Sequence, residues 1–243
     1  MAKLNVILVG KGQMGAVLTK LIDSSDDLQC VGAYDVDNIS ELGKAAPAAD
    51  VLIDFSNPQA LDAITAYVRR THAALVVGTT GLSAQEVEKI KELGEVSAVI
   101  QSGNYSLGVA TLRHLARLAA TSLPGWDIEI VETHHNKKAD APSGTAKMLV
   151  EAVDPSGASE LVYGREGAVG PRSKQEIGIH SVRGGTVAGT HEVHFFGQDE
   201  EVVLSHRATS REIFATGALA AARKLVNADP GFYSFDELMF DAH

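Results

Sequence analysis

The chain has 243 residues, of which 45% are hydrophobic and 5% aromatic, and it carries a formal net charge of −10. This length and apolar content are sufficient for one large or two modest globular domains and argue against a disordered chain. The acidic balance argues against a general nucleic-acid surface, and no stretch approaches the roughly 20 apolar residues of a membrane span.

The cysteine count and the first residues bear on location. Cys30 is the only cysteine, so no disulfide forms within the chain, as is typical of a reducing compartment. The opening MAKLNVILVGKGQMG has an apolar run that is too short for a secretion signal and ends in glycines. We therefore expect a cytoplasmic protein with no membrane and no nucleic-acid partner.

The first hundred residues alternate short apolar runs with segments of helical period. Continuous apolar runs are typical of strands that are buried on both faces of a parallel sheet. The expected strands are Asn5 to Val9, Gln29 to Tyr34, Val51 to Phe55, Ala74 to Val77 and Val96 to Ile100. Helix signals between them are the apolar stripe Met14, Val17, Leu18, Leu21 and Ile22, a Pro58 suited to a first helical position, and the capping-box pair Ser83 and Glu86. Repeated strand-helix-strand units predict an α/β, doubly wound, Rossmann-type parallel sheet.

The pattern changes after Asn104. A helix is expected from Leu107 to Ser122 and a strand from Asp127 to Thr133, and the segment from Ile177 to His206 is strand-like with glycines between the runs. These elements predict a second α+β domain with a mostly antiparallel sheet.

The remaining segments complete the predicted organisation. Residues Asp154 to Gly170 are expected to form a surface loop, Arg211 to Val226 an amphipathic helix, and the tail after Pro230 a segment that packs back on the first domain. We therefore expect a dinucleotide-binding domain of residues 1–105 and 212–243, and a substrate-binding and oligomerisation domain of residues 106–211.

A glycine turn follows the first strand. "VILVGKGQMGAVL" places Gly10, Gly12 and Gly15 in G-x-G-x-x-G spacing, which allows a tight turn and close approach of backbone N–H groups to a pyrophosphate at a helix N-terminus. Asp35 ends the second strand, where an acid accepts hydrogen bonds from ribose hydroxyls. Its charge favours NADH over NADPH, although Lys11 can offset it. The alternative is a structural turn with an ordinary loop acid.

Two further loops fall at the carboxyl ends of predicted strands, where a doubly wound sheet binds its ligands. Their small and hydroxyl-bearing residues suit the ribose and nicotinamide end of a dinucleotide, although either loop alone could be merely a turn. These residues are Gly78, Thr79 and Thr80 in "VVGTTGLS", and Ser102, Gly103, Asn104 and Tyr105 in "VIQSGNYSLG".

Positive charge is concentrated in "ETHHNKKADAPSGTA". The preceding strand delivers His134 and His135 with side chains on opposite sides, and Lys138 follows in the loop. Ser143-Gly144-Thr145 then opens a helix, whose N-terminus attracts anions. This arrangement predicts a clamp for a carboxylate, with a solvated basic loop as the alternative.

A metal site is disfavoured. Adjacent histidines lack the i, i+4 spacing of helical ligand pairs, and no set of cysteine or glutamate ligands accompanies them. His191 and His194 lie in a strand-like run and are expected to serve packing or the surface.

The long motif closely resembles the signature of the 4-hydroxy-tetrahydrodipicolinate reductase family. The glycine turn, "GTTG", "SGNYSLGV", "SVRGGTVAGTH" and "HRATSREIFATGA" also occur in the family's order, so the resemblance covers essentially the whole chain. It implies an oxidoreductase of L-lysine biosynthesis by the diaminopimelate route, which uses NADH or NADPH on a cyclic dicarboxylate. It also implies a homotetramer assembled by the second domain.

The resemblance implies residue roles by position. His134 matches an acid/base, Lys138 the proton donor and His135 a substrate contact, while Ser143, Gly144 and Thr145 fall where a substrate carboxylate is held. The expected cofactor contacts are Gly10, Lys11, Gly12, Gln13, Met14, Gly15, Asp35, Gly78, Thr79, Thr80, Ser102, Gly103, Asn104 and Tyr105. The glycine turn is one residue shorter than the longer family form. Two other classes share parts of the pattern, namely another Rossmann oxidoreductase such as an amino-acid dehydrogenase, and a non-catalytic nucleotide sensor.

Overall fold

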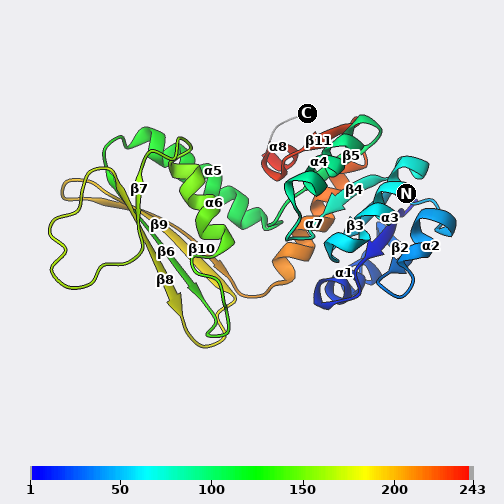
Figure 1. The fold of residues 1–243 in the computed structure, drawn as a ribbon, viewed down its shortest axis with the longest axis horizontal. Helices are drawn as coiled ribbons and strands as arrows, with labels where there is room; N and C mark the ends of the chain where they lie inside the picture. The colour runs from blue at the N-terminus through cyan, green and yellow to red at the C-terminus, as the bar shows by residue number, and fades with distance from the viewer. Residues whose placement is uncertain (1, 241–243) are drawn as a thin grey trace. The chain divides into compact units, whose positions relative to one another are not determined.

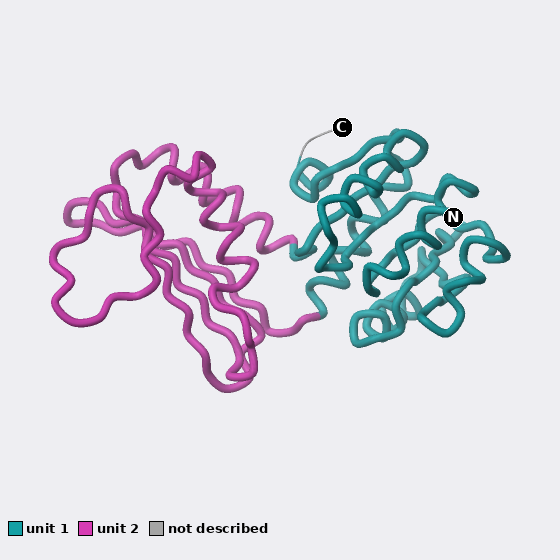
Figure 2. Tube along the Cα trace, in the orientation of Figure 1, with its two compact units in different colours: residues 1–106, 212–243 teal, residues 107–211 magenta. Residues whose placement is uncertain are grey.

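The computed structural model describes residues 2–240, and residue 1 and residues 241–243, at the ends of the predicted first domain, lie outside the described part. The chain divides into two compact units (Figure 2). Unit 1 comprises Met1–Ser106 and Glu212–His243, and unit 2 comprises Leu107–Arg211. Within the described residues, no helix is long and apolar enough to cross a membrane.

Unit 1 is built on a six-stranded parallel sheet in the order β11-β5-β4-β3-β1-β2 (Figure 1). The strands are β1 (Leu4–Val9), β2 (Leu28–Tyr34), β3 (Val51–Asp54), β4 (Ala74–Val77), β5 (Ala98–Gln101) and β11 (Gly231–Tyr233). The helices are α1 (Gln13–Asp23), α2 (Ile39–Ala45), α3 (Leu61–Thr71), α4 (Ala84–Glu92), α7 (Glu212–Leu225) and α8 (Phe235–Phe240), with short 3-10 helices η1 (Pro58–Ala60) and η2 (Leu93–Glu95). The Rossmann-type class is confirmed.

Local chemistry explains most of these boundaries. The predicted capping box of Ser83 and Glu86 is present at the start of α4. Pro58 begins η1 rather than α3, because Asn57 caps this short 3-10 turn. β5 begins two residues later than predicted, since the N–H of Val96 still bonds to Leu93 and closes the preceding turn. The tail packs back as expected, with β11 pairing in parallel with β5.

Unit 2 has a five-stranded sheet in the order β10-β9-β6-β8-β7. Its elements are α5 (Leu107–Ser122), β6 (Asp127–His134), α6 (Gly144–Val153), β7 (Glu160–Val162), β8 (Glu176–Arg183), β9 (Gly189–Phe196) and β10 (Glu201–Ala208). β9 is antiparallel to β10 and β6, whereas β8 is parallel to β6 and β7. The sheet is therefore mixed: the predicted antiparallel pairing is present on both sides of β9, and parallel pairing is added on both sides of β8, because α6 carries the chain from β6 back to parallel strands.

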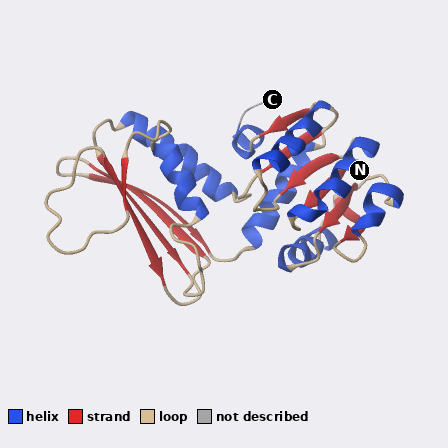
Figure 3. Cartoon of the chain, viewed as in Figure 1, coloured by secondary structure: helices blue, strands red, loops and turns tan. Residues whose placement is uncertain are grey.

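The segment predicted as a surface loop, residues 154–170, contains the short edge strand β7. The core of unit 2 lies between the sheet and α5 with α6 (Figure 3). Leu112 and Leu149 of the helices pack there against Ile130, Val193 and Phe195 of the strands, all of which are buried. The polar end of β6, beyond this core, lies beside the N-terminus of α6.

Candidate active site

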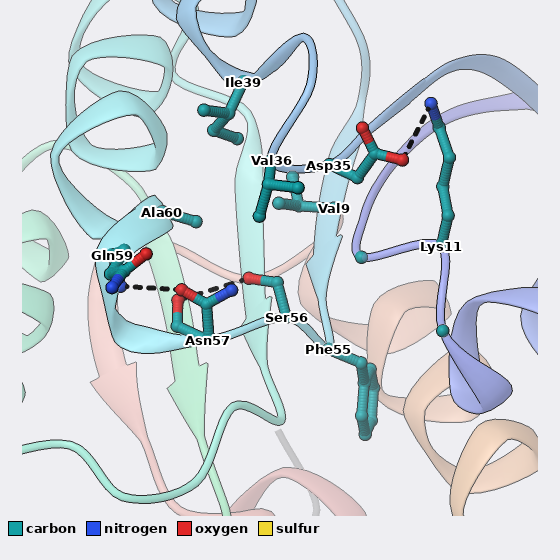
Figure 4. Close-up of a pocket in the computed structure, with 12 residues that line it drawn as sticks. Val9, Lys11, Asp35, Val36, Ile39, Phe55, Ser56, Asn57, Gln59 and Ala60 are labelled. Atoms are coloured by element: carbon teal, nitrogen blue, oxygen red, sulfur yellow. Dashed lines mark hydrogen bonds and ion pairs between the residues drawn. The ribbon is translucent and has the colours of Figure 1, made fainter.

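A pocket of about 550 Å³ opens at the carboxyl ends of β1, β2 and β3 (Figure 4). The chain passes from β1 to β2 on one side and reaches β3 on the other, so this is the switch point at which doubly wound sheets bind ligands. The lining residues are Val9, Gly10, Lys11, Gly12, Asp35, Val36, Ile39, Phe55, Ser56, Asn57, Gln59 and Ala60.

Two glycines of the turn are required by close backbone contacts. Gly10 has a φ of +100°, and a Cβ on Gly15 would lie 1.9 Å from the carbonyl oxygen of Gly10. Gly12 caps α1 without any side-chain hydrogen bond, and a Cβ there would meet no atom within 4 Å. The N-terminus of α1 therefore has no capping side chain across it, as a pyrophosphate cradle requires.

Asp35 stands at the end of β2 with Lys11 beside it. The Nζ of Lys11 lies 3.2 Å from Oδ2 of Asp35 (Figure 4). The N–H of Asp37 donates to the other carboxylate oxygen. Burial works to raise the pKa of Asp35, but these hydrogen bonds outweigh it and hold the pKa below its usual value. The carboxylate is therefore ionised and can accept hydrogen bonds from ribose hydroxyls.

The other predicted cofactor residues follow β4 and β5 at the same edge but do not line this pocket. Thr79 is buried, and its hydroxyl accepts from the N–H of Ser56 at 2.9 Å. Tyr105 is buried as well, and its hydroxyl donates to the carbonyl of Val77 at 2.8 Å. These two side chains hold the loops, whereas Thr80 and Gly103 are exposed. Gly78 and Ser102 are intermediate in exposure, and Asn104 is buried.

One wall of the pocket was not predicted. Ser56, Asn57 and Gln59 lie across from Asp35 and follow β3 (Figure 4). The signal was present, since β3 ends at the same edge as its neighbours and a polar segment follows it. Predicted residues Gln13, Met14 and Gly15 form the first turn of α1 and are not among the lining residues.

In unit 2, the end of β6 brings together residues that were partly predicted. Glu132 and His134 share one face of the strand because side chains alternate, and both are buried. In the register of the sheet, β8 places Arg183 opposite His134, and β9 places His191 opposite Glu132. Glu132, Arg183 and His191 were not predicted as site residues.

Glu132 is the centre of a hydrogen-bond network. Arg183 donates to both of its carboxylate oxygens, at 2.7 and 2.8 Å, and Nδ1 of His134 lies 2.5 Å from Oε2. The N–H of Ser143 donates to Oε1 at 3.1 Å. Burial works to raise the pKa of Glu132, but the hydrogen bonds from Arg183 and His134 lower it from 4.5 to about 2.

The two other polar side chains of the predicted carboxylate clamp, those of Lys138 and His135, are also engaged. Nζ of Lys138 lies 2.7 Å from Oδ1 of Asp140, and the carbonyl of Asp140 accepts from Arg183 at 2.8 Å. His135 is half-buried, with Nε2 at 3.2 Å from Arg211, and its N–H donates to Val187. The glycine-rich connection between β8 and β9 thus supports the loop that carries Lys138.

The start of α6 combines one inward-facing and one open residue. The hydroxyl of Ser143 accepts from the N–H of Ala146 and lies 3.1 Å from Nε2 of His191. Ser143 is 2% exposed, so its side chain supports the helix, and its contact with the substrate stays a prediction. Gly144 is exposed with no neighbour within 4 Å of a would-be Cβ, and half-buried Thr145 follows it. First-turn N–H groups have no acceptor within their own helix and suit a carboxylate.

Across residues 2–240, no group of three or more His, Cys, Asp or Glu side chains is arranged to hold a metal ion. The chemistry of unit 2 is instead that of a cationic corner, formed by Lys138, Arg183, the imidazoles of His134 and His135 and the N-terminus of α6. The nucleotide-type pocket of unit 1 and the cationic corner of unit 2 together define a two-domain, nucleotide-dependent oxidoreductase.

Comparisons with known proteins give the family. Residues 4–105 match the family described as dihydrodipicolinate reductase, N-terminus, and residues 108–239 match its C-terminus. A 4-hydroxy-tetrahydrodipicolinate reductase of Caldanaerobacter subterraneus subsp. tengcongensis is 40% identical over 237 residues, covering 94% of each chain. The chain belongs to the dihydrodipicolinate reductase family.

One solved structure agrees with this assignment, and a second shares the fold. The dipicolinate-bound dihydrodipicolinate reductase from Paenisporosarcina sp. TG-14 has a TM-score of 0.77 and 25% identity, covering 96% of this chain and 97% of that one. A C. glutamicum DAP dehydrogenase in complex with DAP has a TM-score of 0.57 at 14% identity, covering 100% of this chain and 97% of that one. The second likeness shows the fold alone.

Proposed function

We propose that this chain reduces (2S,4S)-4-hydroxy-2,3,4,5-tetrahydrodipicolinate to (S)-2,3,4,5-tetrahydrodipicolinate with NAD(P)H and loss of water, in L-lysine biosynthesis. The family match along both halves of the chain carries this proposal. The balance is simple: the substrate loses one water and gains one hydride and one proton, while the nucleotide is oxidised.

The cationic corner of unit 2 takes the ring dicarboxylate in this proposal. Lys138 pairs with one carboxylate or donates a proton to the ring, and the N-terminus of α6 at Gly144 and Thr145 binds a carboxylate oxygen. His134 exchanges a proton, and His135 contacts the substrate. A positioned proton donor typically contributes about 10²–10⁴-fold to a rate. The dipicolinate-bound relative supports a planar dicarboxylate as the ligand class.

The pocket of unit 1 fits a nicotinamide dinucleotide. Gly10 and Gly15 allow the close approach of the pyrophosphate, and Asp35 can accept from the ribose. The bound nucleotide supplies the hydride. Gly78, Thr80, Ser102 and Gly103 lie at the same edge, where the nicotinamide end is expected.

A direct test is a turnover assay with enzymatically generated 4-hydroxy-tetrahydrodipicolinate and each reduced nucleotide in turn, followed by the loss of reduced nicotinamide absorbance. We expect substrate-dependent oxidation and inhibition by pyridine-2,6-dicarboxylate. If an amino acid instead reduces the oxidised nucleotide, the chain is an amino-acid dehydrogenase. Nucleotide binding without any turnover would indicate a sensor.

We further propose a modest preference for NADH. The Asp35 carboxylate repels a 2′-phosphate, while Lys11 offsets part of that repulsion across 3.2 Å. Asp35→Asn should raise kcat/KM for NADPH relative to NADH by about tenfold. Asp37→Asn, which removes an exposed acid two residues away, is the control and should leave the ratio unchanged. A ratio that Asp35→Asn does not alter would contradict this assignment.

We also propose a homotetramer formed through the face of the unit 2 sheet opposite α5 and α6. This face exposes Val182, Phe196 and Val203, which are 47%, 39% and 43% exposed. Copies of the same chain would cover these apolar side chains. Sedimentation velocity should give a tetramer that Val203→Glu weakens, and a monomeric wild type would exclude it.

The cytoplasmic location stays a prediction, which cell fractionation checks.

A further inference from the structure

The buried carboxylate of Glu132 connects His134, the start of α6 and the loop of Lys138. Its side chain has no exposed surface, and its two oxygens accept from Arg183, from His134 and from the N–H of Ser143. Arg183 continues the network to the carbonyl of Asp140, whose carboxylate pairs with Lys138. A displacement of Glu132 would therefore move the imidazole, the helix cap and the lysine loop together.

The network also determines which imidazole nitrogen carries the proton. An ionised carboxylate only accepts hydrogen bonds, so Nδ1 of His134 must be the donor across the 2.5 Å contact. In the neutral ring, Nε2 then has a lone pair and no proton. Among the described residues Nε2 has no hydrogen-bond partner. Gly189 lies beside it, and a Cβ added to Gly189 would lie 3.1 Å from Nε2.

The charges around His134 favour this neutral form. Burial lowers the pKa of His134, and Lys138 and Arg183 lower it further, whereas the hydrogen bond and charge of Glu132 raise it; the net direction is downward. The titratable and charged groups that face this histidine and its ring neighbour His191 come from four strands and the loop after β6. They are Glu132, Lys138, Asp140, Arg183, His191 and His206.

We propose that Glu132 and Arg183 are positioning residues that keep the proton of neutral His134 on Nδ1, so that Nε2 is presented to the substrate as a proton acceptor. The proton that Nε2 takes from the ring as the hydroxyl leaves is returned to the ring after hydride addition, and the one proton that the reaction consumes comes from Lys138. Lys138 is then the cation that donates. This inference rests on the proposed function for its catalytic consequence, but the tautomer itself does not depend on turnover. The same constellation of imidazole and buried carboxylate orients histidines in other enzymes.

The tautomer can be read directly in the wild-type chain. With ¹⁵N-labelled histidine, NMR of the full chain above the titration of His134 should show a protonated Nδ1 and an unprotonated Nε2. The signals are assigned by their loss in His134→Gln. A proton on Nε2 would overturn the proposal, whether or not the chain reduces the proposed substrate.

Glu132→Gln tests the catalytic consequence. The amide can donate to Nδ1 and so favour the other tautomer, and we expect kcat to fall about 10²-fold or more with the KM for the nucleotide within about twofold. The carboxylate of Glu132 raises the pKa of His134, so its removal lowers that pKa. The acid limb of the pH-rate profile should therefore move to lower pH. Glu132→Asp keeps a carboxylate and should retain more activity.

Glu129 provides a matched control on the same strand. Its carboxylate lies 2.7 Å from Nε2 of His180 and accepts two hydrogen bonds from Arg165, so Glu129→Gln removes a similar set away from the corner. We expect it to keep the wild-type pH profile. Wild-type kcat and pH profile in Glu132→Gln would refute the positioning role. If that variant does not fold, the wild-type NMR result decides alone. Absence of wild-type turnover would count against the proposed function only.

Discussion

At the scale of single residues, Lys138 and Lys137 stand next to each other but in different surroundings. The side chain of Lys138 is 20% exposed and pairs with Asp140, whereas Lys137 is exposed. Sequence alone distinguished them only by the register of the motif. The structure adds that Asp140 holds the ammonium beside the end of β6, where a ring carboxylate can replace it as a partner.

We predict that Lys138→Ala lowers kcat by about 10²-fold or more, because the proton donor and the anchoring charge are both lost. Steady-state kinetics and nucleotide titration check this, with nucleotide affinity expected to stay near that of the wild type. Lys137→Ala is the control and should keep its turnover. Equal loss of turnover and nucleotide binding in Lys138→Ala would indicate misfolding instead.

The residues missed from the sequence are those whose partners lie far along the chain. Glu132 precedes His134 by two positions, so the period of a strand already placed both on one face. Arg183 is 51 residues further on, and only the parallel pairing of β6 with β8 brings it to Glu132. His191, expected in packing or at the surface, is buried against Ser143.

At the scale of elements, the turn from β1 to α1 uses its glycines for two different reasons. Gly15 is required by packing, since a Cβ would lie 1.9 Å from a backbone carbonyl within the turn. Gly12 has open space around it and an extended conformation that any residue adopts. Its role in our proposal is to leave room for the pyrophosphate.

We predict that Gly15→Ala destabilises the chain by roughly 1–3 kcal/mol, because the backbone of the turn must shift. Gly12→Ala should change stability by less than about 0.5 kcal/mol yet weaken nucleotide binding by about tenfold. Denaturant unfolding and nucleotide titration separate the two effects. Unchanged nucleotide affinity in Gly12→Ala would contradict the assigned cradle.

At the scale of the whole molecule, stability should respond to acid through the buried groups of unit 2. Burial, followed by the charge of His134, lowers the pKa of His191 from 6.5 to about 4. The hydrogen bonds of Glu132 lower its pKa from 4.5 to about 2. Both folded-state values lie below the unfolded ones, so in both cases the unfolded chain binds more protons and the stability decreases as the pH falls.

We predict a first loss of stability as the pH falls from about 6.5 to about 4, through His191, and a second from about 4.5 to about 2, through Glu132. The second is on the order of 3 kcal/mol for a shift of this size. Urea unfolding at a series of pH values measures both. His191→Gln should remove most of the first loss. His194→Gln, whose side chain lies on the other face of β9, should retain it.

The sequence by itself determined the Rossmann-type class, because buried parallel strands and a glycine turn leave a local pattern of apolar runs and small residues. Ala74–Val77 and Leu107–Ser122 were predicted to the residue. The motif from Glu132 to Ala146 likewise identified the family and the cationic corner from adjacent residues alone.

The tertiary structure decided what depends on pairing between distant segments. Strand direction in unit 2 became mixed because α6 returns the chain parallel to β6, and no local period records the direction of a partner strand. The same pairing joins Arg183 and His191 to Glu132, and thereby orients His134. Sequence places reactive groups along the chain, but hydrogen-bond partners, protonation and burial arise only when the strands that carry them meet.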